Sequence, residues 1–129
     1  RREKSIKKTA CNGRWKEGIM DEVDLKEVHR LCRMDAIYWT EHVGRRLIKR
    51  RISPQEIITT LMNGKIIEQY PTDYPFPSCL VFSIIDQGRP LHVVCSVGNE
   101  QLFIITAYQP APSEWDSTFT VRKKDGESL

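Results

Sequence analysis

Residues 79–108, CLVFSIIDQGRPLHVVCSVGNEQLFIITAY, decide the fold of this chain. Three apolar runs with a period of two, which is typical of β-strands, are separated here by short polar turns. Turns as short as DQGR and VGNE join antiparallel neighbours, so the runs predict a meander. Another run with a period of two follows Gly64. The predicted strands are 65–70, 79–86, 89–97 and 101–108.

A strong helix start precedes these strands. Ser53 can cap the helix, Pro54 suits the first helical position, and Glu56 completes a capping box. The apolar residues that follow predict a helix at 54–62. The Asn-Gly pair at 63–64 is expected to end it in a left-handed C-cap.

The residues between 21 and 51 predict two further helices. Asp21 can cap a first helix at 22–33, and a second helix runs through 36–51. At 100° per residue, the side chains of the second helix separate into two arcs. The apolar arc contains Ile37, Thr40, Gly44, Leu47 and Ile48. The basic arc contains His42, Arg45, Arg46, Lys49 and Arg50.

Helices that precede an antiparallel meander predict an α+β fold, with two to three N-terminal helices packed on a twisted four-stranded sheet. A short segment at 117–122 could add an edge strand. We expect a flexible basic arm at 1–20, a single α+β domain at 21–124 and a loose tail at 125–129.

The charge distribution indicates either an anionic partner or a well-solvated surface. The net charge of +3 is unevenly divided, because residues 1–51 carry 15 Lys and Arg against 8 Asp and Glu, whereas residues 52–129 carry 5 against 9. A basic half favours nucleic acid or an acidic protein as the partner, and the opposite charges of the two halves would suit head-to-tail self-association.

The hydropathy and the cysteines indicate the compartment. No apolar run reaches membrane-spanning length and no signal-peptide pattern is visible. The four cysteines are scattered, without a Cys-x-x-Cys pair. We therefore expect a cytoplasmic protein with free thiols and no membrane partner.

The basic arc could bind an anion. His42 and Arg46 lie four residues apart and therefore share one helix face, with Lys49 and Arg50 one turn further on. A guanidinium fits phosphate geometry and an imidazole exchanges protons near neutral pH. The set could thus bind RNA or stabilise the transition state of RNA cleavage. The alternative is the solvated side of an amphipathic helix.

Two residues on the predicted strands are further candidates. His92 could be a general acid or base if its strand face looks toward the basic helix, and otherwise it is a satisfied core histidine. Tyr108 ends the last strand of the meander. It could stack on a base, or anchor the strand with its hydroxyl in water.

Residues 70–79, YPTDYPFPSC, contain three prolines just before an apolar strand. Proline cannot donate to a strand ladder, so this segment cannot be a central strand. We expect a stiff crossover that covers a sheet edge and closes one end of the core, with Phe76 turned in. Tyr70 and Tyr74 could instead line an RNA site.

Motifs for metals and cofactors are not visible in the sequence. The cysteines and histidines match no zinc spacing, and there is no Gly-rich phosphate loop or hydrolase motif. We expect neither a metal nor a cofactor.

Four stretches between about Trp39 and Lys123 carry a resemblance: TEHVGRRLIKRRISPQEIITTLMNGKIIEQYP, DYPFPSCLVF, GRPLHVVCSV and LFIITAYQPAPSEW. Together they resemble a bacterial and archaeal family of small domains of unknown function. That family is grouped by fold with the RelE/ParE toxin superfamily, near the BrnT-type toxins.

The resemblance implies a toxin-like fold of two helices packed against a twisted antiparallel sheet. It also implies a metal-independent ribonuclease chemistry that uses Arg, Lys, His or Tyr side chains. His42, Arg46 and Arg50 match the His and the two basic positions of the family's helix. His92 matches the His of its RPLHVV element, and Tyr108 matches its strand-end aromatic.

The first hypothesis is a toxin-like, RNA-interacting protein, a candidate metal-independent endoribonuclease of a toxin–antitoxin system with a small antitoxin protein as partner. It requires His42, Arg46 and His92 to lie within one side chain's reach of each other. The predicted catalytic residues are His42, Arg46, His92 and Tyr108. The predicted RNA-binding residues are Arg45, Lys49, Arg50, Tyr70 and Tyr74.

The alternative hypothesis is a non-catalytic interaction module. Here the basic helix face and an exposed edge strand dock an acidic partner or a second copy of the chain, as in a homodimer. This hypothesis predicts tight association in solution and no RNA turnover.

Overall fold

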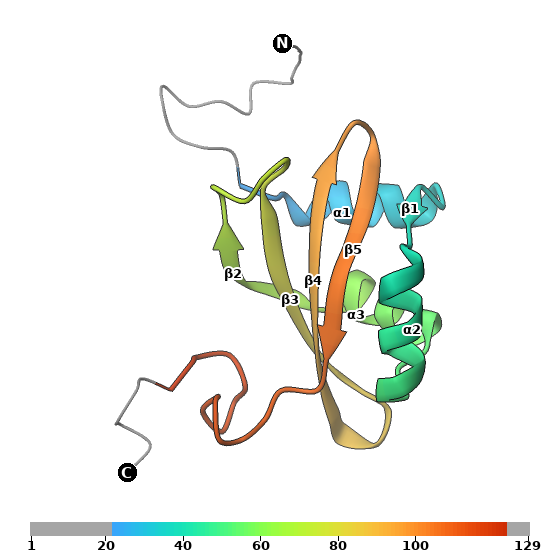
Figure 1. Ribbon diagram of the computed structural model, residues 1–129. Helices are drawn as coiled ribbons and strands as arrows, with labels where there is room; N and C mark the ends of the chain where they lie inside the picture. Colours follow the sequence, from blue (N-terminus) through green and yellow to red (C-terminus); the bar gives the residue numbers. More distant parts are fainter. Residues whose placement is uncertain (1–21, 124–129) are drawn as a thin grey trace.

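The computed structural model describes residues 22–123, which form three α-helices and a five-stranded, mostly antiparallel sheet (Figure 1). The fold is therefore α+β, as predicted, with one strand more than expected. The predictions for residues 1–20, Asp21 and residues 125–129 fall outside the described residues. The elements are α1 (Leu25–Arg33), β1 (Ile37–Tyr38), α2 (Glu41–Arg50), α3 (Pro54–Asn63), β2 (Lys65–Tyr70), β3 (Ser78–Ile85), β4 (Arg89–Gly98) and β5 (Gln101–Tyr108).

The meander β2–β3–β4–β5 forms as the sequence predicts, with each strand boundary within one residue of its expected place. The strand order is β1-β5-β4-β3-β2. The register between β4 and β5 shifts between Val94 and Cys95, and this bulge leaves Ile105 of β5 without a partner on β4. The predicted edge strand at 117–122 is not formed, because Trp115 and Arg122 pair only through a single bridge.

The predicted helix 36–51 is shorter at its start. Ile37 and Tyr38 instead form β1, which pairs in parallel with β5, and the carbonyl of Ala36 accepts a hydrogen bond from the amide of Leu102 at 2.9 Å. The α2 helix begins only after Thr40, whose hydroxyl accepts from the amide of Val43 at 3.0 Å. Two residues are too few to show the alternating pattern of a strand in the sequence. At these positions, pairing with β5 outweighs the helical pattern.

The predicted apolar arc of α2 is only partly correct. Val43 and Leu47 are the buried residues of this helix, whereas Ile48 is 80% exposed. Ile37 and Thr40 lie before the helix. All five residues of the predicted basic arc are exposed to solvent, as expected.

The ends of α1 and α3 follow cap chemistry. Asp24, not Asp21, caps α1 through the amide of Lys26. The predicted capping box at Ser53 is confirmed at the start of α3. The predicted left-handed C-cap of α3 is wrong, because Gly64 has an extended backbone (φ −90°, ψ −171°).

Gly64 is required by a close approach rather than by its dihedral angles. A Cβ atom at this position would lie 2.4 Å from the carbonyl oxygen of Phe82 and 2.6 Å from that of Thr60. Both neighbours are backbone atoms of packed elements, so neither can move away cheaply. The end of α3 can therefore approach β3 only without a side chain at position 64.

The two faces of the sheet are covered differently. The inner face packs on the helices through apolar side chains such as Val81, Leu91 and Ile104, and Figure 1 shows α2 alongside β5. The outer face bears His92 and is covered near that residue by residues 109–123, called the C-terminal segment below. None of the helices in the described part of the chain is long and apolar enough to cross a membrane.

Candidate functional site

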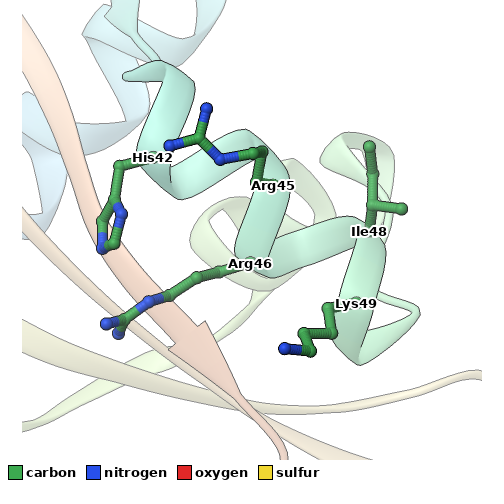
Figure 2. A pocket seen from close by; sticks show the side chains of 5 residues that line it. All are labelled: His42, Arg45, Arg46, Ile48 and Lys49. Atoms are coloured by element: carbon green, nitrogen blue, oxygen red, sulfur yellow. The ribbon is translucent and has the colours of Figure 1, made fainter.

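Four basic residues of α2 form one exposed row: His42, Arg45, Arg46 and Lys49, called the basic stripe below. Their spacing of three and four residues places them on one flank of the helix. Together with Ile48 they line a shallow pocket of about 580 Å³. Figure 2 shows His42 and Arg46 extending to the same side of α2, in the direction of β5.

One member of the stripe has an acidic neighbour. The guanidinium of Arg45 lies 3.0 Å from the carboxylate of Glu41, and both side chains are mostly exposed. An exposed pair of this kind contributes little to stability and is readily exchanged for another anion. The stripe therefore remains a surface that can bind negative charge.

Arg50 is not part of the stripe, although the sequence placed it there. Its guanidinium donates to the backbone carbonyl of Ala107 at 2.8 Å and to the hydroxyl of Thr106 at 3.2 Å. These contacts satisfy the edge of β5 beyond the short pairing with β1. Arg50 therefore joins α2 to the sheet.

His92 is fully buried on the outer face of the sheet. Its Nε2 lies 2.8 Å from the carbonyl oxygen of Phe119, and its Nδ1 lies 3.4 Å from the hydroxyl of Tyr108. A carbonyl only accepts, so Nε2 carries the proton and Nδ1 accepts from Tyr108. Its ring packs edge-on against Trp115 at 4.4 Å between centroids.

The surroundings of His92 are those of a satisfied core histidine. Burial lowers its pKa, and the hydrogen bond with Phe119 opposes this only in part. Both ring nitrogens are occupied, so neither is available to a group on α2 or to a substrate. The hydrogen bonds and ring contacts described for His92 thus involve Phe82, Tyr108, Trp115 and Phe119, and none of them reaches His42 or Arg46.

Tyr108 and Tyr70 are also engaged in contacts near the C-terminal segment. The ring of Tyr108 packs edge-on against His92, with 5.3 Å between centroids. Burial raises the pKa of the Tyr108 hydroxyl. The hydroxyl of Tyr70 donates to the carboxylate of Glu68. Burial, followed by this bond, raises the pKa of Tyr70 to about 12.

A salt bridge between Arg122 and Glu68, which the sequence does not predict, completes this network. Arg122 contacts both carboxylate oxygens of Glu68, at 2.9 and 3.2 Å, and its guanidinium lies 4.7 Å from the centre of the Trp115 ring. Burial alone would raise the pKa of Glu68, but the hydrogen bonds from Arg122 and Tyr70 outweigh it and the pKa is lowered. Residues 54 apart in sequence leave no local signal for such a pair.

A second pocket, called the aromatic groove below, lies on the outer face between residues 73–76 and β5. Its volume is about 480 Å³. Phe76 stacks on Phe103 with 5.8 Å between ring centroids and 17° between planes, and Tyr38 meets Phe103 edge-on at 5.8 Å. The groove is lined by Asp73, Tyr74, Pro75, Phe76, Ser96, Phe103 and Ile105.

The predicted roles of the proline-rich segment are partly corrected by this groove. Phe76 is turned onto the sheet, as expected, but onto the outer face rather than over a sheet edge. Tyr74 is 94% exposed at the mouth of the groove. The sequence had pointed to Tyr74, but the contributions of Phe103 and Tyr38 could not be recognised without the strand pairing.

Metal-binding side chains do not cluster in the described part of the chain. Among residues 22–123, no group of three or more His, Cys, Asp and Glu side chains could hold a metal ion. Within the same range Cys32, Cys79 and Cys95 are free thiols, and the sulfur atoms of Cys79 and Cys95 lie 3.9 Å apart.

Comparison with known proteins places the chain in a family. No curated protein matches it. The family model described as "Domain of unknown function (DUF4258)" matches residues 39–109. The match spans more than half of the chain and runs from the residue before the Thr40 cap to the residue after β5, so it includes the basic stripe and the groove-lining residues. This chain therefore belongs to the DUF4258 family of domains of unknown function.

Proposed function

We propose that this protein binds single-stranded RNA, with the phosphodiester backbone following the basic stripe of α2. The observation that carries the proposal is the row His42, Arg45, Arg46 and Lys49, which is exposed throughout and lines one pocket. Phosphate contacts supply most of the sequence-independent affinity for nucleic acids, and arginine forks match phosphate geometry. The toxin-like RNA partner expected from the sequence resemblance agrees with this surface.

We propose RNA binding rather than RNA cleavage, because two of the four predicted catalytic residues contact each other and are not part of the stripe. A metal-independent ribonuclease needs groups that move protons at the attacked phosphate. His92 and Tyr108 contact each other beneath the C-terminal segment, through a hydrogen bond and through their rings. His42 is the exposed imidazole of the stripe. Any metal-independent cleavage at the stripe would therefore be expected to depend on His42.

The test is a binding titration of a short, mixed-sequence, single-stranded RNA in EDTA, followed by fluorescence anisotropy at several salt concentrations. We expect Arg46→Gln to weaken binding about tenfold and to lower the slope of log Kd against log salt by about one. Lys65→Gln removes the same charge from β2, at the other edge of the sheet, and should change neither quantity by a comparable amount.

Electrophoresis of the same RNA after incubation measures cleavage, with His42→Ala beside the wild type. Loss of cutting in this variant would extend the proposal to a nuclease. If the wild type does not bind RNA, or if Arg46→Gln and Lys65→Gln bind as the wild type does, the proposal is wrong and a protein partner or a second copy is the better explanation of the stripe.

A further inference from the structure

We infer that the aromatic groove holds one unstacked base of the bound RNA, so that the outer face of the sheet and the stripe of α2 form one continuous interface. This inference rests on the proposed function and adds the part of the RNA that is recognised. It assigns a role to Tyr74, Phe76 and Phe103, which have none in the stripe.

The side chains that line the groove suit a nucleic-acid base. Three of its seven lining residues are aromatic, and Phe76 and Phe103 are stacked on the outer face beside an almost fully exposed Tyr74. Every base has a π-face that can stack on such rings, and stacking on aromatic side chains is a general means of binding single strands. The Asp73 carboxylate and the Ser96 hydroxyl add polar groups to an otherwise apolar lining.

The groove also has a size that suits a single base. A volume of about 480 Å³ lies within the usual range of small-ligand pockets. An amphipathic helix would need a longer binding surface than these seven lining residues provide. A single flat ring with polar edges fits both the volume and the lining.

The groove also adjoins α2, the helix that carries the stripe. Ile105 lines the groove, and the next residue, Thr106, accepts a hydrogen bond from Arg50 of α2 at 3.2 Å. On the other side of Phe103, Tyr38 continues the row of rings toward the start of α2, which begins three residues later. Figure 2 shows His42 and Arg46 directed from α2 to the β5 side.

The charge beside the groove favours RNA over an apolar partner. The groove adjoins an exposed cationic row, which complements a phosphodiester backbone and would repel a basic peptide. A base can enter the groove only if it is not stacked inside a duplex. The occupant is therefore a base of a single strand, with its phosphates on the stripe.

Tyr74 offers the sharpest test because it is 94% exposed, so its replacement does not disturb the core. We expect Tyr74→Leu to weaken single-stranded RNA binding by about five- to a hundredfold, with the salt slope unchanged because no phosphate contact is lost. Tyr74→Phe keeps the aromatic face and should bind as the wild type does. A duplex of the same sequence should bind the wild type and Tyr74→Leu alike.

A spectroscopic arm uses an RNA that carries a single 2-aminopurine. Stacking in the groove should quench its fluorescence on binding to the wild type and to Tyr74→Phe, and less on binding to Tyr74→Leu. Replacing that nucleotide with an abasic one should remove most of the difference in affinity between the wild type and Tyr74→Leu.

The outcomes separate the two proposals. If Arg46→Gln weakens binding but Tyr74→Leu does not, the groove is not a base site and the stripe alone binds RNA. If duplex and single strand respond equally to Tyr74→Leu, the inference is also wrong. If the wild type binds no RNA, both proposals fail together, and retention of an aromatic peptide in the groove would then identify a protein-binding site.

Discussion

At the residue scale, the environment of each side chain decides its role more than its chemical type does. His92 and His42 are both imidazoles, yet His92 is sealed between Trp115, Tyr108 and the carbonyl of Phe119, whereas His42 is exposed on α2. Glycines divide in the same way. Gly98 provides a flat surface for the ring of Phe76, whereas Gly64 allows two backbones to approach.

The buried His92 predicts a pH dependence of stability. Its pKa in the folded protein is lowered, so the unfolded chain, with an ordinary pKa of about 6.5, binds the proton more readily. Its contribution to stability is therefore complete at neutral pH and above, and is lost as the pH falls below about 6.5. Urea unfolding at a series of pH values should show a decrease that is shallower in His92→Gln, and equal slopes would contradict the assignment.

Gly98, the last residue of β4, predicts a coupling between this strand end and the aromatic groove. An added Cβ would lie 2.3 Å from the ring of Phe76, so Gly98→Ala must displace this ring and should cost about 1–3 kcal/mol of stability. A double-mutant cycle with Phe76→Ala, measured by chemical denaturation, should show that the cost of Gly98→Ala largely disappears without the ring.

Gly64→Ala is the matched control for this cycle. Its clashes are with the backbone oxygens of Phe82 and Thr60, so its cost should be the same with and without Phe76. Additive costs for Gly98→Ala and Phe76→Ala would show that the ring does not rest on Gly98.

At the element scale, α2 performs two tasks on adjacent flanks. Val43 and Leu47 bury one flank in the core, and Arg50 continues this flank to the edge of β5. The basic stripe occupies the neighbouring flank, exposed to solvent. The same helix therefore completes the open edge of the sheet, which would otherwise be available for pairing, and presents its charges beside the outer face.

The two flanks of α2 predict different effects on stability for two charge-conserving substitutions. Arg50→Lys keeps the charge but loses the fork that reaches Thr106 and Ala107, so it should lower the free energy of unfolding by about 1 kcal/mol while RNA affinity stays within about twofold. Arg46→Lys should leave stability unchanged. Denaturation and RNA titration of both variants decide the matter, and equal stabilities would show that the Arg50 contacts are not structural.

At the scale of the whole molecule, the sheet has one face covered by helices and one shared between the C-terminal segment and the open groove. Trp115, 2% exposed, holds the segment on the outer face through His92 and Arg122. Arg122 in turn binds Glu68 on β2, so the segment spans from β5 to the far edge of the sheet. The family match ends at residue 109, where this segment begins.

This arrangement predicts that the C-terminal segment stabilises the folded protein but is not needed to form the aromatic groove. Trp115→Ala should cost about 3–5 kcal/mol, because it removes a large buried ring from contact with His92. A chain ending at Gln109 should unfold at lower temperature and bind a hydrophobic dye, because His92 and Tyr108 are uncovered. A chain ending at Lys123 is the control, and equal melting temperatures for the two chains would contradict the prediction.

Local chemistry explains which parts of the fold could be predicted. The turns DQGR and VGNE and the capping box at Ser53 act over a few residues, so the meander and the start of α3 were predicted within one residue. β1 was missed because two residues carry no periodicity. Ile48 was expected to be buried because it lies on the apolar arc. Helical spacing alone does not show which part of that arc contacts the sheet edge.

The candidate site could likewise be predicted only in part. The sequence by itself determined an α+β meander with helices before it, and the basic residues of one helix, because periodicity and helical spacing are local properties. Only the tertiary structure decided that His92 is buried against Trp115 and the carbonyl of Phe119 and that Arg50 caps a strand edge. It also decided that Phe103 and Phe76 meet beside Tyr74, because strand order and the choice of covered face depend on contacts between residues far apart in the chain.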